Sequence, residues 1–203
     1  MRRRTRENLA CLRTLARGRR GRTFTLEDAL RFGISRKTIA KLASDPDGSA
    51  RIARFDRGIY QVIPDRAEDH VIAAWRKVGE DAIASHRTAL ALHNLSDIEP
   101  RGYEFTVPRS RRSRSYGERF KIHTTTSRPK VVSVHGVPVT SVTRTIVDCA
   151  LLGEQTEIAI AQAFARGLTT EAELREEARL RARAVRDAIE RAIAVRDSYA
   201  AYI

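Results

Sequence analysis

The sequence contains few cysteines and no long apolar run. Cys11 and Cys149 are its only cysteines, they lie far apart, and each falls in an apolar helical pattern, which excludes a disulfide framework and a cysteine zinc cluster. No stretch approaches the roughly eighteen consecutive apolar residues of a membrane helix, and the start, Met1 to Arg4, is basic instead of apolar. We therefore expect a cytoplasmic protein that binds no membrane and keeps both thiols in its core.

Familiar catalytic motifs are also missing. The sequence has no phosphate-binding glycine loop and no nuclease-like Asp followed by a Glu-x-Lys strand. His86 and His93 lie seven residues apart, two turns of a helix, and with Asp97 they invite a metal or general-base interpretation. No third ligand follows at a fitting interval, and histidines in an Ala/Leu-rich helix more often bond to backbone groups. We therefore expect no enzyme activity, no metal site and no cofactor.

The net charge of +13 is concentrated in the first third of the chain. Residues 1–60 hold sixteen Lys and Arg against six Asp and Glu, a net of +10, whereas residues 61–203 hold twenty-two against nineteen, a net of +3. A basic segment joined to a nearly neutral one indicates that one part binds a polyanion and the other does not. The 203 residues leave room for two small domains, and nucleic acid is the partner that fits the first.

Apolar periodicity predicts three helices and a hairpin in residues 1–64. The helices are expected over 5–17, 25–32 and 35–44, and the strands over 52–55 and 59–63. Thr25 with Asp28, and Ser35, match helix-capping patterns, and Gly33 supplies a left-handed or otherwise tight turn between the second and third helices. The loop Asp56-Arg57-Gly58 fits a three-residue hairpin connection. Pro64-Asp65 marks the expected domain boundary.

Ala29, Gly33 and Ile39, four and then six residues apart, match the signature of a helix-turn-helix. The helices approach closely at the first position, the backbone turns at the second, and a branched apolar residue at the third anchors the recognition helix. The hairpin that follows makes the motif winged, and we expect it to bind double-stranded DNA. Arg36 and Lys37 are the candidates for base edges. The candidates for phosphate or minor-groove contacts are Arg22, Ser35, Thr38, Lys41, Arg51, Arg54 and Arg57.

Two further basic stretches lie outside this motif. Arg2 to Arg4 form an arm that either follows the DNA backbone or has no fixed structure. Pro108 is followed by a Ser/Arg-rich loop, which is either a second nucleic-acid or partner contact or a solvated connection. The basic residues of this loop are Arg109, Arg111, Arg112 and Arg114.

From residue 65 onward the sequence predicts a mixed α/β domain with a helical tail. Helices are expected over 67–77, 85–93 and 142–152, and strands over 103–107, 119–124, 131–134 and 137–139. From about Glu154 the pattern is helical, with a break at Gly167, and its Ala-rich positions favour a helix packed along one face over a coiled-coil seam. The expected fold class is α+β, with domains over 1–64 and 65–203.

Several segments of the chain resemble the AbiEi family of antitoxins, from the type IV toxin-antitoxin pairs of abortive infection. The segments are Gly33 to Arg36, Arg57 to Tyr60, Ala84 to His93, Thr106 to Arg109, Val137 to Ser141 and Arg144 to Asp148. The resemblance implies a transcriptional repressor that binds inverted repeats in its own promoter. It also implies that the second domain counteracts a nucleotidyltransferase-like toxin, with or without direct contact. The helical tail departs from the family pattern and argues against a nuclease-like branch.

Two alternatives stay open beside the autoregulatory antitoxin. One is an ordinary winged-helix transcriptional regulator whose second domain senses a ligand or forms a dimer. A nucleotidyltransferase-like reading frame next to the gene favours the antitoxin over this regulator. The other is a nucleic-acid enzyme, which predicts an activity that is lost on mutating His86 or His93 while DNA binding survives.

Overall fold

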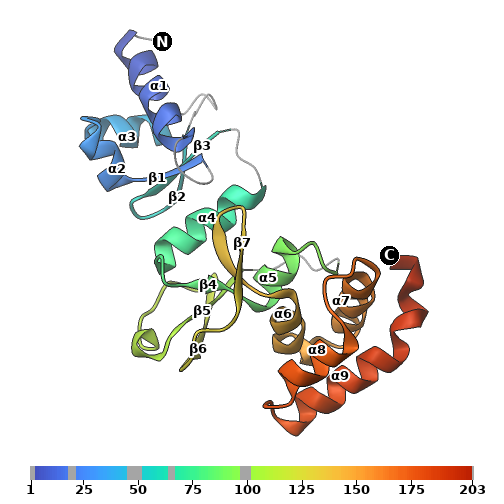
Figure 1. The fold of residues 1–203 in the computed structure, drawn as a ribbon. Helices are drawn as coiled ribbons and strands as arrows, with labels where there is room; N and C mark the ends of the chain where they lie inside the picture. Colours follow the sequence, from blue (N-terminus) through green and yellow to red (C-terminus); the bar gives the residue numbers. More distant parts are fainter. Residues whose placement is uncertain (1–2, 18–21, 45–51, 64–66, 97–101, 203) are drawn as a thin grey trace. The chain divides into compact units, whose positions relative to one another are not determined.

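The chain folds into two compact units, Met1–Gly79 and Glu80–Ile203, each with its own β-sheet (Figure 1). The computed structural model describes residues 3–17, 22–44, 52–63, 67–96 and 102–202. Both units combine helices with strands, which confirms the expected α+β class. Within the described ranges, no helix is long and apolar enough to cross a membrane.

The first unit packs helices around a three-stranded antiparallel sheet. Its helices are α1 (Arg3–Arg17), α2 (Leu26–Arg31), α3 (Arg36–Ala43) and α4 (Ala67–Val78), and its strands are β1 (Thr23–Thr25), β2 (Ile52–Asp56) and β3 (Ile59–Val62). The strands pair in the order β1-β3-β2. Leu12 of α1 and Ile39 of α3 are fully buried in the core, where the rings of Phe24 and Tyr60 stack with centroids 5.6 Å apart.

Helix α4 belongs to the first unit. Arg76 Nη1 donates to the carbonyl oxygen of Thr23 in β1 at 2.8 Å, and Lys77 forms an ion pair with Asp56 at the end of β2. These contacts hold α4 on the sheet, so the boundary expected near residue 64 lies instead after Gly79. Pro64 and Asp65, which suggested the earlier boundary, lie outside the described residues.

The second unit contains a five-stranded mixed sheet. Its strands are β4 (Ile83–Ala84), β5 (Tyr103–Pro108), β6 (Phe120–Thr125), β7 (Val131–Val134) and β8 (Val137–Thr140), in the order β6-β5-β4-β8-β7. The central strand β4 pairs antiparallel with β5 and parallel with β8. Because β4 has only two residues and β1 only three, neither shows the alternation that predicts a strand, and both were missed from the sequence.

The helices of the second unit share one core. They are α5 (His86–Leu92), α6 (Val142–Asp148), α7 (Glu154–Ala165), α8 (Glu171–Ala178) and α9 (Arg183–Val195), with 3₁₀ turns over Arg109–Arg111, Ala150–Leu152 and Arg196–Tyr202. Each helix contributes a side chain that is almost fully buried in a single cluster. These side chains are Leu90, Ile146, Ile160, Leu174 and Ile189. The C-terminal helices expected from about Glu154 are present, and they complete the core of this unit.

Candidate functional site

A tight turn joins α2 to α3. The amide of Ile34 donates to the carbonyl of Ala29 at 3.0 Å, and the amide of Gly33 donates to that of Leu30 at 2.9 Å, the pair of bonds that defines a Schellman motif. Gly33 has φ +74°, the left-handed conformation predicted for it. A Cβ atom there would meet nothing within 4 Å, so the requirement for glycine is conformational. Ala29 and Ile39 are both fully buried, as their spacing predicts.

Both helices begin at the predicted caps. Thr25 Oγ1 accepts from the Asp28 amide at 3.1 Å, and Asp28 Oδ2 accepts from the Thr25 amide at 2.9 Å, a reciprocal capping box. Ser35 Oγ accepts from the Thr38 amide at 3.2 Å and lies 3.0 Å from Thr38 Oγ1. One hydroxyl of this pair donates to the other. One of the two hydroxyl protons of Ser35 and Thr38 is therefore used in this bond. The other can donate to a phosphate, whereas the sequence predicted that both could.

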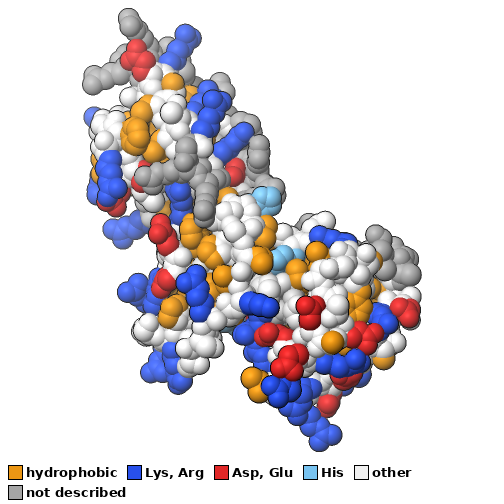
Figure 2. Space-filling view, viewed as in Figure 1, with side chains coloured by type: hydrophobic (Ala, Val, Ile, Leu, Met, Phe, Trp, Pro, Cys, Tyr) orange, Lys and Arg blue, Asp and Glu red, His pale blue; other side chains and the backbone are white. Residues whose placement is uncertain are grey.

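The outward face of α3 is basic. Arg36, Lys37 and Lys41 are exposed, and the opposite face buries Ile39 and Leu42. Within the described part of the chain, these three cations form no ion pair, and the first turn of α3 contains no acidic residue. Figure 2 shows basic side chains at the surface of this unit. The face is available to an anionic partner.

The β2–β3 hairpin packs beside α3, since α3 contacts β2. Its connection is the two-residue turn Arg57–Gly58 next to a register shift between Arg54 and Asp56, and not the three-residue loop expected. Gly58 takes φ +78° in this turn. Arg54 and Arg57 are exposed. Of the other predicted contacts, Arg22 is half-buried and Arg51 lies outside the described residues. Of the expected arm, Arg2 also lies outside them, whereas Arg3 and Arg4 form the start of α1 instead of a separate arm.

Asp56, the acidic residue of the hairpin, is neutralised from α4. It forms an ion pair with Lys77, and its Oδ1 accepts from the Arg57 amide at 2.5 Å. Burial raises the pKa of Asp56, but these two hydrogen bonds outweigh it and hold the pKa below its ordinary value. Arg54 Nε donates to the carbonyl oxygen of Asp56 at 3.4 Å, and the guanidinium groups of Arg54 and Arg57 form no ion pair with the described acidic residues.

The basic loop after β5 contains two kinds of arginine. Arg111 turns inward: it forms an ion pair with Asp81, and its Nη2 donates to Tyr116 Oη at 2.8 Å. It therefore supports the loop and is not available to a ligand, which removes it from the predicted second basic contact. The remaining candidates of that contact are exposed, and they are Arg109, Arg112 and Arg114.

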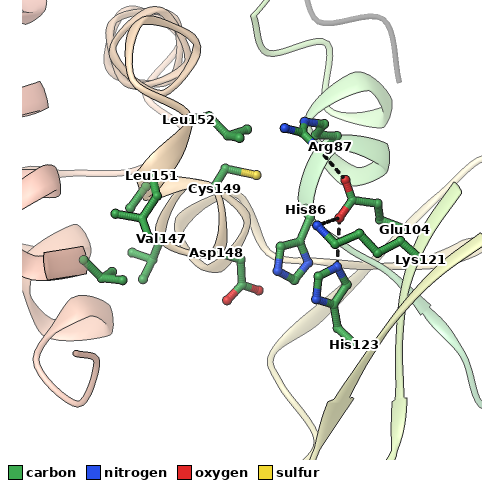
Figure 3. A pocket seen from close by; sticks show the side chains of 12 residues that line it. His86, Arg87, Glu104, Lys121, His123, Val147, Asp148, Cys149, Leu151 and Leu152 are labelled. Carbon is green, nitrogen blue, oxygen red and sulfur yellow. Dashed lines mark hydrogen bonds and ion pairs between the residues drawn. The ribbon is translucent and has the colours of Figure 1, made fainter. Parts of the chain in front are cut away.

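The second unit holds a polar pocket of about 280 Å³ (Figure 3). Its ionisable lining residues come from α5, β5, β6 and α6, and they are His86, Arg87, Glu104, Lys121, His123 and Asp148. The rings of His86 and His123 stack with centroids 3.5 Å apart and planes 10° apart. Strand pairing brings Glu104, Lys121 and His123 together, because β5 runs parallel to β6 with Glu104 opposite Lys121.

Glu104 is a buried carboxylate with cationic and imidazole partners. Its side chain is 8% exposed, and Oε2 lies 2.8 Å from His123 Nε2 and 3.5 Å from Lys121 Nζ. Oε1 lies 3.4 Å from Arg87 Nη1. Burial raises the pKa of Glu104, but the hydrogen bond to His123 and the charge of Lys121 outweigh this and lower the pKa to about 2. The group is therefore ionised at neutral pH.

His86 begins α5 in a conformation unusual for a residue with a side chain. Its φ is +51°, in the left-handed region. Its Nδ1 lies 3.1 Å from Oγ of the buried Ser85, which in turn accepts from Thr106 Oγ1 at 2.9 Å. Burial, with the nearby His123, lowers the pKa of His86 to about 4, so its ring is neutral at neutral pH.

The grouping of His86 with His93 and Asp97 does not form. His93 Nε2 donates to the carbonyl of Thr140 at 2.8 Å, as expected of a packed histidine, and Asp97 lies outside the described residues. The further ligands that His86 lacks on its own helix come instead from neighbouring strands, and they are Glu104 and His123. Sequence spacing within one helix could not reveal them. The signal for this grouping in the sequence was a carboxylate, Glu104, and an imidazole, His123, each inside a β-rich run.

Asp148 and Cys149 also line the pocket, but other interactions occupy Asp148 and the thiol of Cys149 is protonated. Both carboxylate oxygens of Asp148 bond Arg144 Nε, at 2.9 and 2.8 Å, and Oδ1 also accepts from Arg181 Nη2 at 3.0 Å. Burial raises the pKa of the Cys149 thiol far above its ordinary value, so this cysteine stays protonated. Cys149 is buried as predicted, whereas Cys11 is half-buried, and both are free.

Comparisons with known proteins give a likeness of fold. No family model matches the chain, and no curated protein matches it. Among solved structures, it is similar to the crystal structure of the RV2827C protein from Mycobacterium tuberculosis, with a TM-score of 0.59 and 13% sequence identity. The match covers 95% of this chain and 78% of that chain. At this identity, the likeness concerns the arrangement of the backbone alone.

Proposed function

We propose that the first unit is a winged helix-turn-helix that binds double-stranded DNA. The order of its elements, α1, β1, α2, α3 and then the β2–β3 hairpin, fits this motif, with α3 as the recognition helix. The observation that carries the proposal is the outward face of α3, where Arg36, Lys37 and Lys41 have no acidic partner among the described residues. Cations without an internal counter-charge bind an external polyanion at little cost.

The dimensions of α3 suit the major groove. An α-helix with its side chains is about 10–12 Å in diameter, and the major groove is about 12 Å wide. Arg36 and Lys37 lie in the first turn, the part of a recognition helix that contacts base edges. We expect Arg54 and Arg57 on the adjacent hairpin to contact phosphates or the minor groove.

DNA binding is tested with the DNA upstream of the gene, by fluorescence anisotropy at fixed salt. We expect the Arg36→Ala, Lys37→Ala double variant to lose at least about tenfold in affinity, since each base contact contributes roughly 1–3 kcal/mol. The matched control replaces Arg179 and Arg183, two exposed arginines of the second unit, by alanine. It removes the same charge and should bind normally. Equal loss in both variants would contradict a specific role for α3.

We further propose that the whole chain is an antitoxin of the AbiEi type, which represses its own operon and counteracts a nucleotidyltransferase-like toxin. Segments that carry the resemblance lie next to one another in the fold, and this supports the proposal. Ser85 Oγ accepts from Thr106 Oγ1 at 2.9 Å, and Ala84 pairs with Val139 in β8. Thr140 Oγ1 lies 2.7 Å from Thr145 Oγ1 at the start of α6. The resembling segments of the second unit thus form one connected structure.

The antitoxin proposal is tested by coexpression with a nucleotidyltransferase-like protein encoded beside the gene. The full chain should restore growth, and so should the Arg36→Ala, Lys37→Ala variant when expressed from a foreign promoter, because neutralisation is assigned to the second unit. Toxicity that persists beside a well-expressed chain, or a locus with no such reading frame, would contradict the proposal.

The polar pocket of the second unit favours one other candidate, a transcriptional regulator that senses a ligand. Glu104 and the stacked imidazoles present ionisable groups to a cavity of about 280 Å³. The regulator predicts operator affinity that changes when the pocket is filled, and no rescue of growth from a toxin. The coexpression experiment therefore separates the two candidates.

A further inference from the structure

We propose that His86, Glu104 and His123 form a binding site for a divalent transition-metal ion of the zinc class. Their ligand atoms all lie within 4.8 Å of one another in the pocket of the second unit (Figure 3). Two imidazoles and a carboxylate are a ligand set that Zn²⁺ takes in proteins. The proposal stands apart from DNA binding and toxin neutralisation, since it concerns only this pocket.

The donor atoms need small movements to surround an ion. Bonds of about 2.1 Å to nitrogen and oxygen place tetrahedral ligands about 3.4 Å apart, so donors within 4.8 Å must approach by no more than about 1.4 Å. His123 Nε2 and Glu104 Oε2 are 2.8 Å apart and now share a hydrogen bond. An ion between them replaces the proton of that bond, and the ionised carboxylate supplies the negative charge.

His86 supplies the third donor from the start of α5. A neutral imidazole is the form that coordinates a metal. In the tautomer with the proton on Nδ1, that nitrogen donates to Ser85 Oγ at 3.1 Å and leaves the Nε2 lone pair for the ion. A hydrogen bond at the second ring nitrogen is typical of metal-binding histidines. The ring, now parallel to His123, must turn so that both Nε2 atoms point at one ion.

The backbone around the site holds the ligands on one frame. Thr88 Oγ1 accepts from the Glu104 amide at 2.8 Å, which ties α5 to β5 within a buried contact. His86 keeps φ +51°, a strained conformation for a residue with a side chain. Such residues cluster at functional sites, where the surrounding structure enforces them.

Neighbouring charges leave one coordination position open. Lys121 lies 3.5 Å from Oε2 but is 63% exposed, so its ammonium can move into solvent when the ion binds. Arg87 bonds the other carboxylate oxygen, Oε1. Asp148 is held by Arg144 and Arg181 and is not a further ligand. Three protein ligands and an open side facing the pocket are the arrangement in which zinc keeps a water or a small anionic ligand.

Cobalt absorption tests the site directly. The full chain, with any purification tag removed, is stripped with EDTA, dialysed and titrated with Co²⁺, and Zn²⁺ is then added as competitor. We expect saturable 1:1 binding with visible d–d absorption that Zn²⁺ abolishes. His123→Gln and Glu104→Gln should each weaken binding at least 100-fold. The control is His135→Asn in the β7–β8 turn, which removes an exposed histidine at φ +48°, where asparagine is tolerated.

Thermal unfolding with and without Zn²⁺ keeps the test decisive if a ligand variant folds poorly. Zn²⁺ should raise the Tm of the wild type and of His135→Asn, because an ion that binds the folded state stabilises it. It should leave the Tm of His123→Gln unchanged. Absence of 1:1 uptake by the wild type overturns the proposal, as does uptake undiminished by both ligand variants or lost equally in the control. DNA binding by the stripped protein is measured separately and decides nothing about the metal.

Discussion

The amide of Ile34 donates a hydrogen bond to the carbonyl of Ala29 at 3.0 Å, and this bond closes the turn that connects α2 to α3. Gly33 makes it possible with φ +74°. We expect Gly33→Ala to destabilise the first unit by about 1 kcal/mol, since alanine resists left-handed backbone. Gly33→Asn should cost less, because asparagine tolerates that region. Urea unfolding measures both, and equal stability of Gly33→Ala and wild type would contradict the assignment.

The buried carboxylate of Asp148 joins α6 to the chain between α8 and α9. It is 5% exposed and bonds both Arg144 and Arg181. We expect Asp148→Asn to destabilise the second unit by roughly 1–3 kcal/mol, because both guanidinium groups lose this buried counter-charge and retain the half-buried Glu177. Asp187→Asn breaks the exposed pair with Arg183 and should cost less than about 0.5 kcal/mol. Comparable unfolding free energies for the two variants would argue against the network.

Helix α9 contributes to the core instead of lying on its surface. Ile189 is 1% exposed within the cluster of the second unit, whereas Leu180, just before α9, is 85% exposed. Ile189→Ala should therefore cost roughly 2–5 kcal/mol of unfolding free energy, and Leu180→Ala close to none. Both are measured by chemical denaturation of the full chain. A mild effect of Ile189→Ala would place α9 outside the cooperative unit.

Because of His93, the second unit should lose stability as the pH falls. Burial lowers the pKa of His93 from its ordinary 6.5, and the charge of the nearby Arg166 also lowers it. The hydrogen bond to the Thr140 carbonyl raises the pKa but does not outweigh them. The imidazole of His93 therefore binds a proton near pH 6.5 in the unfolded chain, but only at a lower pH in the folded state. This stabilisation is complete above that pH and is lost as the pH falls toward the lower, folded pKa. Unfolding free energies from pH 7.5 downward should fall less steeply for His93→Gln, and parallel curves would exclude the assignment.

Much of the fold follows from local patterns in the sequence. The first helix, the caps at Thr25 and Ser35 and the glycine turn at Gly33 depend on interactions within a few residues, so they were predicted correctly. The short strands β1 and β4 depend on pairing with distant strands and carry no periodicity of their own. The late boundary likewise depends on the contacts of α4 with the sheet, which only the folded chain reveals.

The polar pocket illustrates the same limit for the site. His86 was noticed and set aside because no third ligand followed on its own helix. Glu104 and His123 reach it through the parallel pairing of β5 with β6, and that register is not readable from residue spacing. Arg111 shows the converse, since a basic loop residue proved to be held by Asp81 and Tyr116. Whether a single side chain is exposed or paired depends on the tertiary structure, so residue spacing does not reveal it.

The salt dependence of operator binding tests the central claim most directly. If about four to six phosphates are neutralised per copy, the slope of log affinity against log salt should be about −4 to −5. The Arg54→Ala, Arg57→Ala variant should reduce the magnitude of this slope by about 2, because it removes two phosphate contacts of the hairpin. A steep slope that flattens in this variant is the predicted result. A slope near zero, or one that the variant leaves unchanged, would contradict DNA binding by the first unit.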